Sequence, residues 1–194
     1  NLDYVIKDYK VTDQSTVASS ISNSSGENVS FLLKNIFFYN TLNSIIVPKN
    51  GRLLSYTNLI ETPTSSTNGF VKNIITSRNY KKINENIFSI QAKIGNVISL
   101  SNNDILSDDK FSLGGRWLRG FDSFGAGPRN SRTSYVGGNN LIVAKLDYSR
   151  ELYKNSDFPV FLNIFNDYGI VWENKTKPTN SDNSLRSSVG FGIK

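Results

Sequence analysis

The chain has 194 residues and a formal net charge of +6, and it contains neither histidine nor cysteine. The usual zinc ligands, a cysteine nucleophile and a Ser–His–Asp triad are therefore excluded, which removes most hydrolases, and we expect no metal and no cofactor. The lysines and arginines are spread along the chain, which argues against a nucleic-acid partner. No apolar run reaches the about 18 residues of a membrane helix, whereas a tilted barrel strand needs only about 9–11.

Residue types typical of strands dominate the chain, and Asn, Gly and Ser interrupt them at intervals. The candidate strands, in chain order, are Leu2–Val11, Val29–Asn40, Arg52–Glu61, Phe70–Tyr80, Ile87–Ile98, Leu141–Glu151, Pro159–Trp172 and Leu185–Ile193. We therefore expect an all-β protein of about eight strands, with the registers of the first three left open.

The predicted connections alternate in length. The longer, polar ones are Thr12–Asn28, Thr62–Gly69, the connection within residues 99–140, and Glu173–Ser184. The mostly shorter ones are Thr41–Gly51, Lys81–Asn86 and Leu152–Phe158. Long loops at one end and short turns at the other are typical of an outer-membrane barrel.

The strands around the longest connection have one apolar and one polar face. In the sixth strand, Lys145, Asp147 and Glu151 alternate with Ile142, Leu146 and Tyr148. In the seventh, Asp167 and Gly169 lie on the face opposite most of the apolar side chains. Two structures fit this alternation: a soluble sheet with a dry core, or a barrel with lipid outside and a polar lumen.

The segment Lys110–Asn140 is too long and too rich in glycine to be a simple turn. Connections of this length without secondary structure of their own are usually functional. Arginines and aromatic residues alternate along it: Arg116, Trp117, Arg119, Phe121, Arg129, Arg132 and Tyr135. Because arginine offers a planar fork of donors and aromatic rings fill volume, we expect this loop to fold back against the sheet.

Several short motifs of this chain occur in a recognisable order. They are Val47-Pro48-Lys49-Asn50-Gly51, Leu118-Arg119-Gly120-Phe121, Gly127-Pro128-Arg129, Gly137-Gly138-Asn139, and Asp167-Tyr168-Gly169-Ile170-Val171-Trp172. In this order and spacing they resemble the motifs of the bacterial surface antigen family, the outer-membrane barrels of BamA and its relatives. One departure is Leu118, which stands where that family usually has Val or Ile.

The resemblance implies an antiparallel transmembrane β-barrel with one extracellular loop folded into its lumen. Residues 1–194 would form a single partial barrel domain without a periplasmic domain, and the rest of the barrel would lie outside the chain. The motif arginine of the family meets the strand aspartate inside the barrel. Carried onto this chain, Arg119 pairs with Asp167, and Gly169 lies beside that pair.

The resemblance also implies a function: a non-enzymatic factor that inserts β-barrel proteins into the bacterial outer membrane. Its partners would be the lipid bilayer, unfolded outer-membrane proteins as clients and, through domains outside this chain, assembly-complex lipoproteins. A two-partner secretion transporter or a TamA-like translocation factor has the same fold and a similar loop, so both remain alternatives. A porin and a soluble β-sandwich binding module are the alternatives from other classes.

Overall fold

The computed structural model describes residues 26–63, 68–101, 104–129, 135–153, 159–174 and 182–193, and also the backbone of residues 2–9. For residues 26–29 and 153 it describes only the backbone. The two helices within these ranges are short 3-10 turns, η1 (Ser107–Asp109) and η2 (Gly115–Trp117). Neither is long or apolar enough to cross a membrane.

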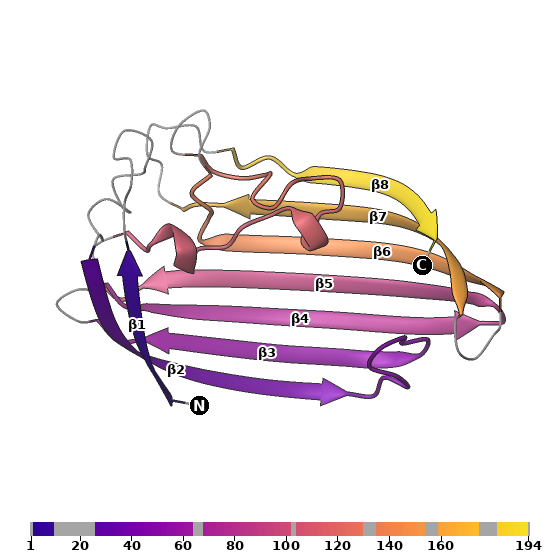
Figure 1. The fold of residues 1–194 in the computed structure, drawn as a ribbon, viewed down its shortest axis with the longest axis horizontal. Helices are drawn as coiled ribbons and strands as arrows, with labels where there is room; N and C mark the ends of the chain where they lie inside the picture. The colour runs from indigo at the N-terminus through magenta and orange to yellow at the C-terminus, as the bar shows by residue number, and fades with distance from the viewer. Residues whose placement is uncertain are drawn as a thin grey trace.

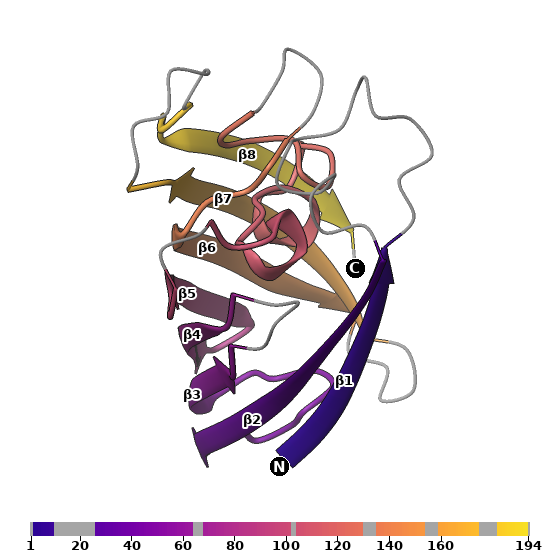
Figure 2. The ribbon, with the colours of Figure 1, turned by 90° about the vertical axis from the view of Figure 1, so that its left-hand side faces the viewer.

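Eight strands form one antiparallel sheet in which each strand pairs with its neighbours in the sequence. They are β1 (Leu2–Tyr9), β2 (Gly26–Asn40), β3 (Gly51–Glu61), β4 (Phe70–Ile83), β5 (Asn86–Ser99), β6 (Asn140–Tyr153), β7 (Val160–Trp172) and β8 (Arg186–Ile193). The sheet curves into an open, partial barrel (Figures 1 and 2). The prediction of an all-β antiparallel barrel is confirmed. The β-sandwich alternative is wrong, because no second sheet packs on the described one.

All eight predicted strands are present, but some of their ends differ. β2 begins at Gly26 instead of Val29, because its first residues pair with Lys7–Tyr9 of β1. β4 runs on to Ile83, so its connection to β5 is a tight turn of two residues, Asn84 and Glu85. Asn84 has a φ of 54°, a backbone conformation that asparagine tolerates better than most residues. Most of the predicted connection Thr12–Asn28 lies outside the described residues.

Longer connections lie mostly at one end of the sheet, as the sequence predicts, although the connection 41–50 has ten residues and 62–69 only eight. Because successive strands are antiparallel, β3, β5 and β7, which precede the connections 62–69, 100–139 and 173–185, all end on the left in Figure 1. The strands β2, β4 and β6, which precede the connections 41–50, 84–85 and 154–159, end on the right. The connection from β5 to β6, residues 100–139, is called the long loop below.

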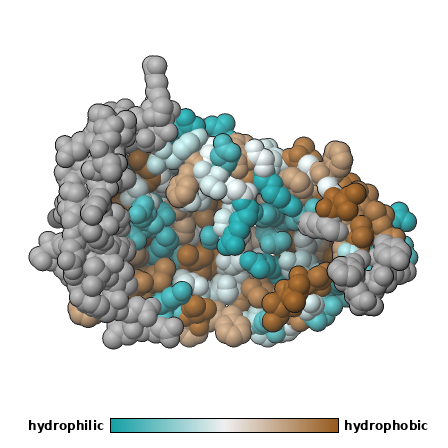
Figure 3. All heavy atoms as spheres, in the orientation of Figure 1, coloured by the Kyte–Doolittle hydropathy of each residue, from teal (hydrophilic) through white to brown (hydrophobic). Residues whose placement is uncertain are grey.

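The two faces of the sheet differ in chemistry. The convex face carries a band of exposed apolar side chains, among them Ile75, Ile94 and Ile142, which pair with one another across β4, β5 and β6. The concave face, shown in Figure 3, has hydrophilic side chains over much of its middle. The buried apolar cluster is small and lies where the long loop covers this face: Val97, Leu141, Val143 and Val171 from the strands contact Phe111, Leu113 and Leu118 from the loop. Within the described residues, the buried apolar core therefore lies between the long loop and the concave face of the sheet.

Candidate functional site: the loop on the concave wall

The long loop lies against the concave face of β5, β6 and β7 (Figures 1 and 2). It is held in shape by short antiparallel bridges that join Phe111 to Gly138 and Leu113 to Ala126. In the first bridge each backbone amide donates to the other residue's carbonyl at 2.9 Å. The predicted inward folding of the loop is confirmed.

Two glycines of the wall receive two apolar side chains of the loop. A Cβ atom on Gly95 of β5 would lie 2.5 Å from Cζ of Phe111. A Cβ atom on Gly169 of β7 would lie 2.7 Å from Cδ1 of Leu113. Real Cβ atoms do not approach other atoms so closely, so both positions require glycine. We call Gly95 and Gly169 the seats of Phe111 and Leu113. Phe111 and Leu113 are 4% and 1% exposed, which shows how completely the wall covers them.

The pair between Arg119 and Asp167 is present. The guanidinium donates through Nε to Oδ2 at 2.7 Å and through Nη2 to Oδ1 at 2.5 Å. The backbone amide of Arg119 donates to Oδ2 as well, at 3.0 Å. The Asp167 side chain is fully buried and that of Arg119 is 24% exposed. Such a two-pronged, charge-assisted contact fixes orientation as well as distance.

Arg119 also binds a second carboxylate that the sequence did not indicate. Its Nη1 donates to Oδ1 of Asp147 on β6 at 2.7 Å, and its guanidinium lies 3.8 Å from the ring centre of Phe165 on β7. Partial burial by itself lowers the pKa of Arg119, but hydrogen bonds to Asp167 and Asp147 outweigh it, so the pKa is raised above its ordinary value. Lys145 approaches Asp167 to 3.9 Å and supplies further positive charge. The arginine thus ties the loop to two wall strands at once.

The other predicted loop residues lie around this pair. Leu118 is fully buried and Phe121 packs against the same cluster. Gly120, between Arg119 and Phe121, has a φ of 83°, which favours glycine.

Farther along the loop, Gly127 and Pro128 are buried, and Gly127 touches Val171 of β7. The guanidinium of Arg129 contacts Tyr135, whose hydroxyl donates to the carbonyl of Gly125 at 2.8 Å. Gly137 and Gly138 continue the chain past Phe111 towards β6, and Gly138 lies against the backbone of Trp172. Arg132 lies outside the described residues.

A second group of ion pairs lies at the opposite end of the concave face, where it joins β6 to β4 and to the connection 41–50. Glu151 of β6, with a side chain 6% exposed, binds Lys49 at 2.9 Å and Lys82 at 3.0 Å. Lys49 belongs to the connection from β2 to β3, and it also lies 5.4 Å from the ring centre of Phe161 on β7. The connection 41–50 therefore reaches across the wall to β6 and β7. The polar alternation of β6 included Glu151, but nothing local in the sequence indicated a partner 102 residues away.

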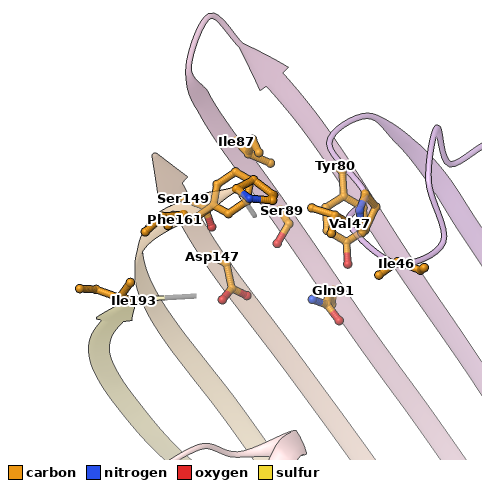
Figure 4. Close-up of a pocket in the computed structure, with 13 residues that line it drawn as sticks. Ile46, Val47, Tyr80, Ile87, Ser89, Gln91, Asp147, Ser149, Phe161 and Ile193 are labelled. Carbon is orange, nitrogen blue, oxygen red and sulfur yellow. The ribbon is translucent and has the colours of Figure 1, made fainter. Parts of the chain in front are cut away.

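Between these two groups lies a cavity of about 660 Å³ (Figure 4). Ile46 and Val47 enter from the connection 41–50, and Tyr80, Ile87 and Phe161 from the wall. Its polar groups come from the strands: Ser89, Gln91, Asp147 and Ser149. Within the described part of the chain, no group of three or more carboxylates, histidines or cysteines could hold a metal ion.

Comparison with known proteins agrees with this geometry. The family model described as the Omp85 superfamily domain matches residues 1–194. No curated protein matches the sequence. Among solved structures, BamA from Haemophilus ducreyi lacking POTRA domains 1–3 superimposes with a TM-score of 0.70 at 18% sequence identity. The match covers 86% of this chain but only 36% of that one, so the chain spans about a third of the BamA structure. The chain belongs to the Omp85 superfamily.

Proposed function

We propose that this chain is part of a bacterial outer-membrane protein that folds and inserts other β-barrel proteins without covalent chemistry. The exposed apolar band of the convex face suits contact with lipid, and a polar concave face suits a lumen. In this proposal client strands pair by backbone hydrogen bonds with a sheet edge of the complete barrel, as in β-augmentation. Assembly-complex lipoproteins and domains that receive clients would act outside this chain.

The observation that carries the proposal is the attachment of the long loop to the concave face of the sheet. An open diffusion pore has no need for a loop fixed to two wall strands by one guanidinium that binds two buried carboxylates. A barrel that must change shape while a client adds to its edge does need an internal brace, because its remaining wall has to keep its curvature. The contacts of Arg119 with Asp167 and Asp147, together with the seats for Phe111 and Leu113, supply that brace.

The likeness to BamA leaves the TamA-like and two-partner secretion functions as competing members of the same superfamily. The fold is common to these functions, so the loop alone does not choose between them. We prefer insertion because a solved structure that resembles this chain is a BamA.

The test uses the full-length protein that carries this chain, reconstituted in vesicles of bacterial phospholipids. A urea-unfolded outer-membrane protein is added, and its folding is followed by the change in gel mobility of the folded barrel. We expect faster folding than in empty vesicles, with no consumption of a nucleotide or other co-substrate. The Arg119→Asp protein should lose most of this acceleration.

A matched control is the Arg52→Gln protein, whose substitution lies on the convex face at the second residue of β3. It should accelerate folding as the unchanged protein does. Wild-type vesicles that fold clients no faster than empty ones, yet admit a secreted protein to their interior, would replace insertion by translocation.

A further inference from the structure

Most strand cations of the concave face bind the loop or a carboxylate. Lys72 of β4 donates to the carbonyl of Asp109 at 2.7 Å. Lys82 of β4 binds Glu151, and Lys145 of β6 donates to the carbonyl of Arg116 at 2.5 Å. These strand lysines therefore bind the long loop or a carboxylate of another strand.

Three cations of the same region differ from these lysines. The side chains of Arg78, Lys93 and Arg116 form no hydrogen bond and no ion pair with any residue that the structure describes. The Nε atom of Arg78 is shielded from solvent and has no acceptor. A guanidinium nitrogen in that position ordinarily has a partner, since a buried donor without one costs about 1–3 kcal/mol.

The sheet register places the first two of these side chains next to each other. Arg78 of β4 faces Gln91 of β5, and Lys93 of β5 faces Thr76 of β4. Arg78 and Lys93 are thus diagonal neighbours on one face, within reach of each other's long side chains.

The ring of Trp117 in η2 joins Arg116 to this group. Nζ of Lys93 lies 4.3 Å from the ring centre, and the guanidinium carbon of Arg116 lies 5.3 Å from it. The loop therefore adds a third cation beside the two on the wall.

Like charges held side by side repel one another, and an anion between them removes that cost. A phosphate group is the anion that suits the set best. It carries nearly two negative charges at neutral pH and offers several acceptor oxygens, which match the planar forks of two arginines and the point charge of one lysine. Contact with Trp117 restricts Lys93 and Arg116, so less side-chain freedom remains to be lost on binding.

We propose that Arg78, Lys93 and Arg116 form a phosphate site on the concave wall beside Trp117. The phosphate belongs either to a free ion or to a phosphorylated lipid headgroup. This site does not depend on the proposed function, because it rests on the three cations alone.

The test is fluorine NMR of the full-length protein in detergent micelles, labelled with 5-fluorotryptophan. Substitution Trp117→Phe assigns the resonance of Trp117. Inorganic phosphate is titrated at constant ionic strength and pH 7, and the resonance should shift and saturate. The double substitution Arg78→Gln with Lys93→Gln should weaken the apparent affinity at least tenfold. Arg116→Gln, at an exposed loop position, should weaken it several-fold and guards against misfolding of the double variant.

The matched control is Arg52→Gln with Lys81→Gln. It removes the same net charge from the convex side of neighbouring strands, so the affinity should stay unchanged. A short-chain phosphatidic acid, titrated beside a short-chain phosphatidylcholine, distinguishes the two sources. Binding that needs the lipid identifies a headgroup, and binding of inorganic phosphate alone identifies the free ion. Absence of saturation with either ligand, an unaltered affinity in the Arg78/Lys93 double variant, or equal binding of acetate would overturn the site.

Discussion

Asp167 receives three hydrogen bonds from Arg119 alone, two from its guanidinium and one from its backbone amide. A fully buried carboxylate is costly unless it is paired and hydrogen-bonded, and here both conditions are met. Arg119 donates only one hydrogen bond to Asp147. The two carboxylates therefore contribute unequally, and Asp167 is the one whose loss leaves the arginine with the fewest partners.

A charge exchange tests this pair. We expect Arg119→Asp and Asp167→Arg to lower the free energy of unfolding by about 3–5 kcal/mol each. The first leaves the buried Asp167 carboxylate without its partner, and the second places a new buried positive charge beside Arg119. The double exchange should recover part of the loss. The recovery is incomplete because the contact of Arg119 with Asp147 is not restored. The measurement is urea unfolding of the full-length protein in vesicles.

Asp147→Asn serves as the comparison for that exchange, and its cost should be smaller than that of Asp167→Asn. Additive effects of the two single exchanges, with no recovery in the double variant, would mean that the two residues do not act as a pair.

The seat of Phe111 is a second residue-scale test. Gly95→Ala places a Cβ 2.5 Å from the Phe111 ring, so we expect a loss of about 1–3 kcal/mol of stability and faster proteolysis of the long loop. Gly192→Ala is the matched control, since nothing lies within 4 Å of a Cβ at that strand glycine. Adding Phe111→Leu to Gly95→Ala makes room and should restore part of the stability. A Gly95→Ala protein as stable as Gly192→Ala would contradict the seat.

At the scale of elements, local patterns predict the strands well and the contacts between distant segments poorly. Alternation in β6 assigned Asp147 and Glu151 to the polar face, because side chains of a strand point to opposite faces in turn. Alternation does not say which segment crosses that face. The contact of Glu151 with Lys49 depends on how the connection 41–50 folds across the sheet, and no short-range rule contains that information.

The beginning of β2 and the contacts of the long loop also depend on segments distant in the sequence, which local patterns do not predict. Gly26, Glu27 and Asn28 are poor strand formers, and pairing with β1 overrides their preference. The Arg119–Asp167 pair was expected only through the resemblance to a family, whereas the seats at Gly95 and Gly169 were not expected at all. A glycine in a strand marks a close approach of some other group, but it does not name that group.

The connection 41–50 carries the next prediction. Glu151→Gln removes a carboxylate that two lysines share, so the connection should detach from the wall and become sensitive to protease. The expected loss of stability is about 1–3 kcal/mol, below that for Asp167, because both lysines remain partly in water. Limited proteolysis followed by mass spectrometry locates the cleavage. Cleavage elsewhere, with residues 41–50 still protected, would show that Glu151 does not hold this connection.

On the scale of the whole molecule, a new charge should destabilise the protein more on the convex face of the sheet than on the concave face. Ile75 on the convex face is 45% exposed, whereas the side chain of Thr57 points to the concave face, one rung away on the neighbouring strand. If lipid covers the convex face, Ile75→Lys should cost about 2–4 kcal/mol when the protein is unfolded from vesicles, because a lysine near the bilayer centre is poorly solvated. Thr57→Lys meets a polar lumen and should cost under about 1 kcal/mol. In a detergent with a thin, mobile shell, the difference between the stability losses of the two lysine variants should become smaller. Equal stability losses in vesicles would show that the convex band does not face hydrocarbon. The assignment of the convex face to lipid and the concave face to the lumen would then be wrong.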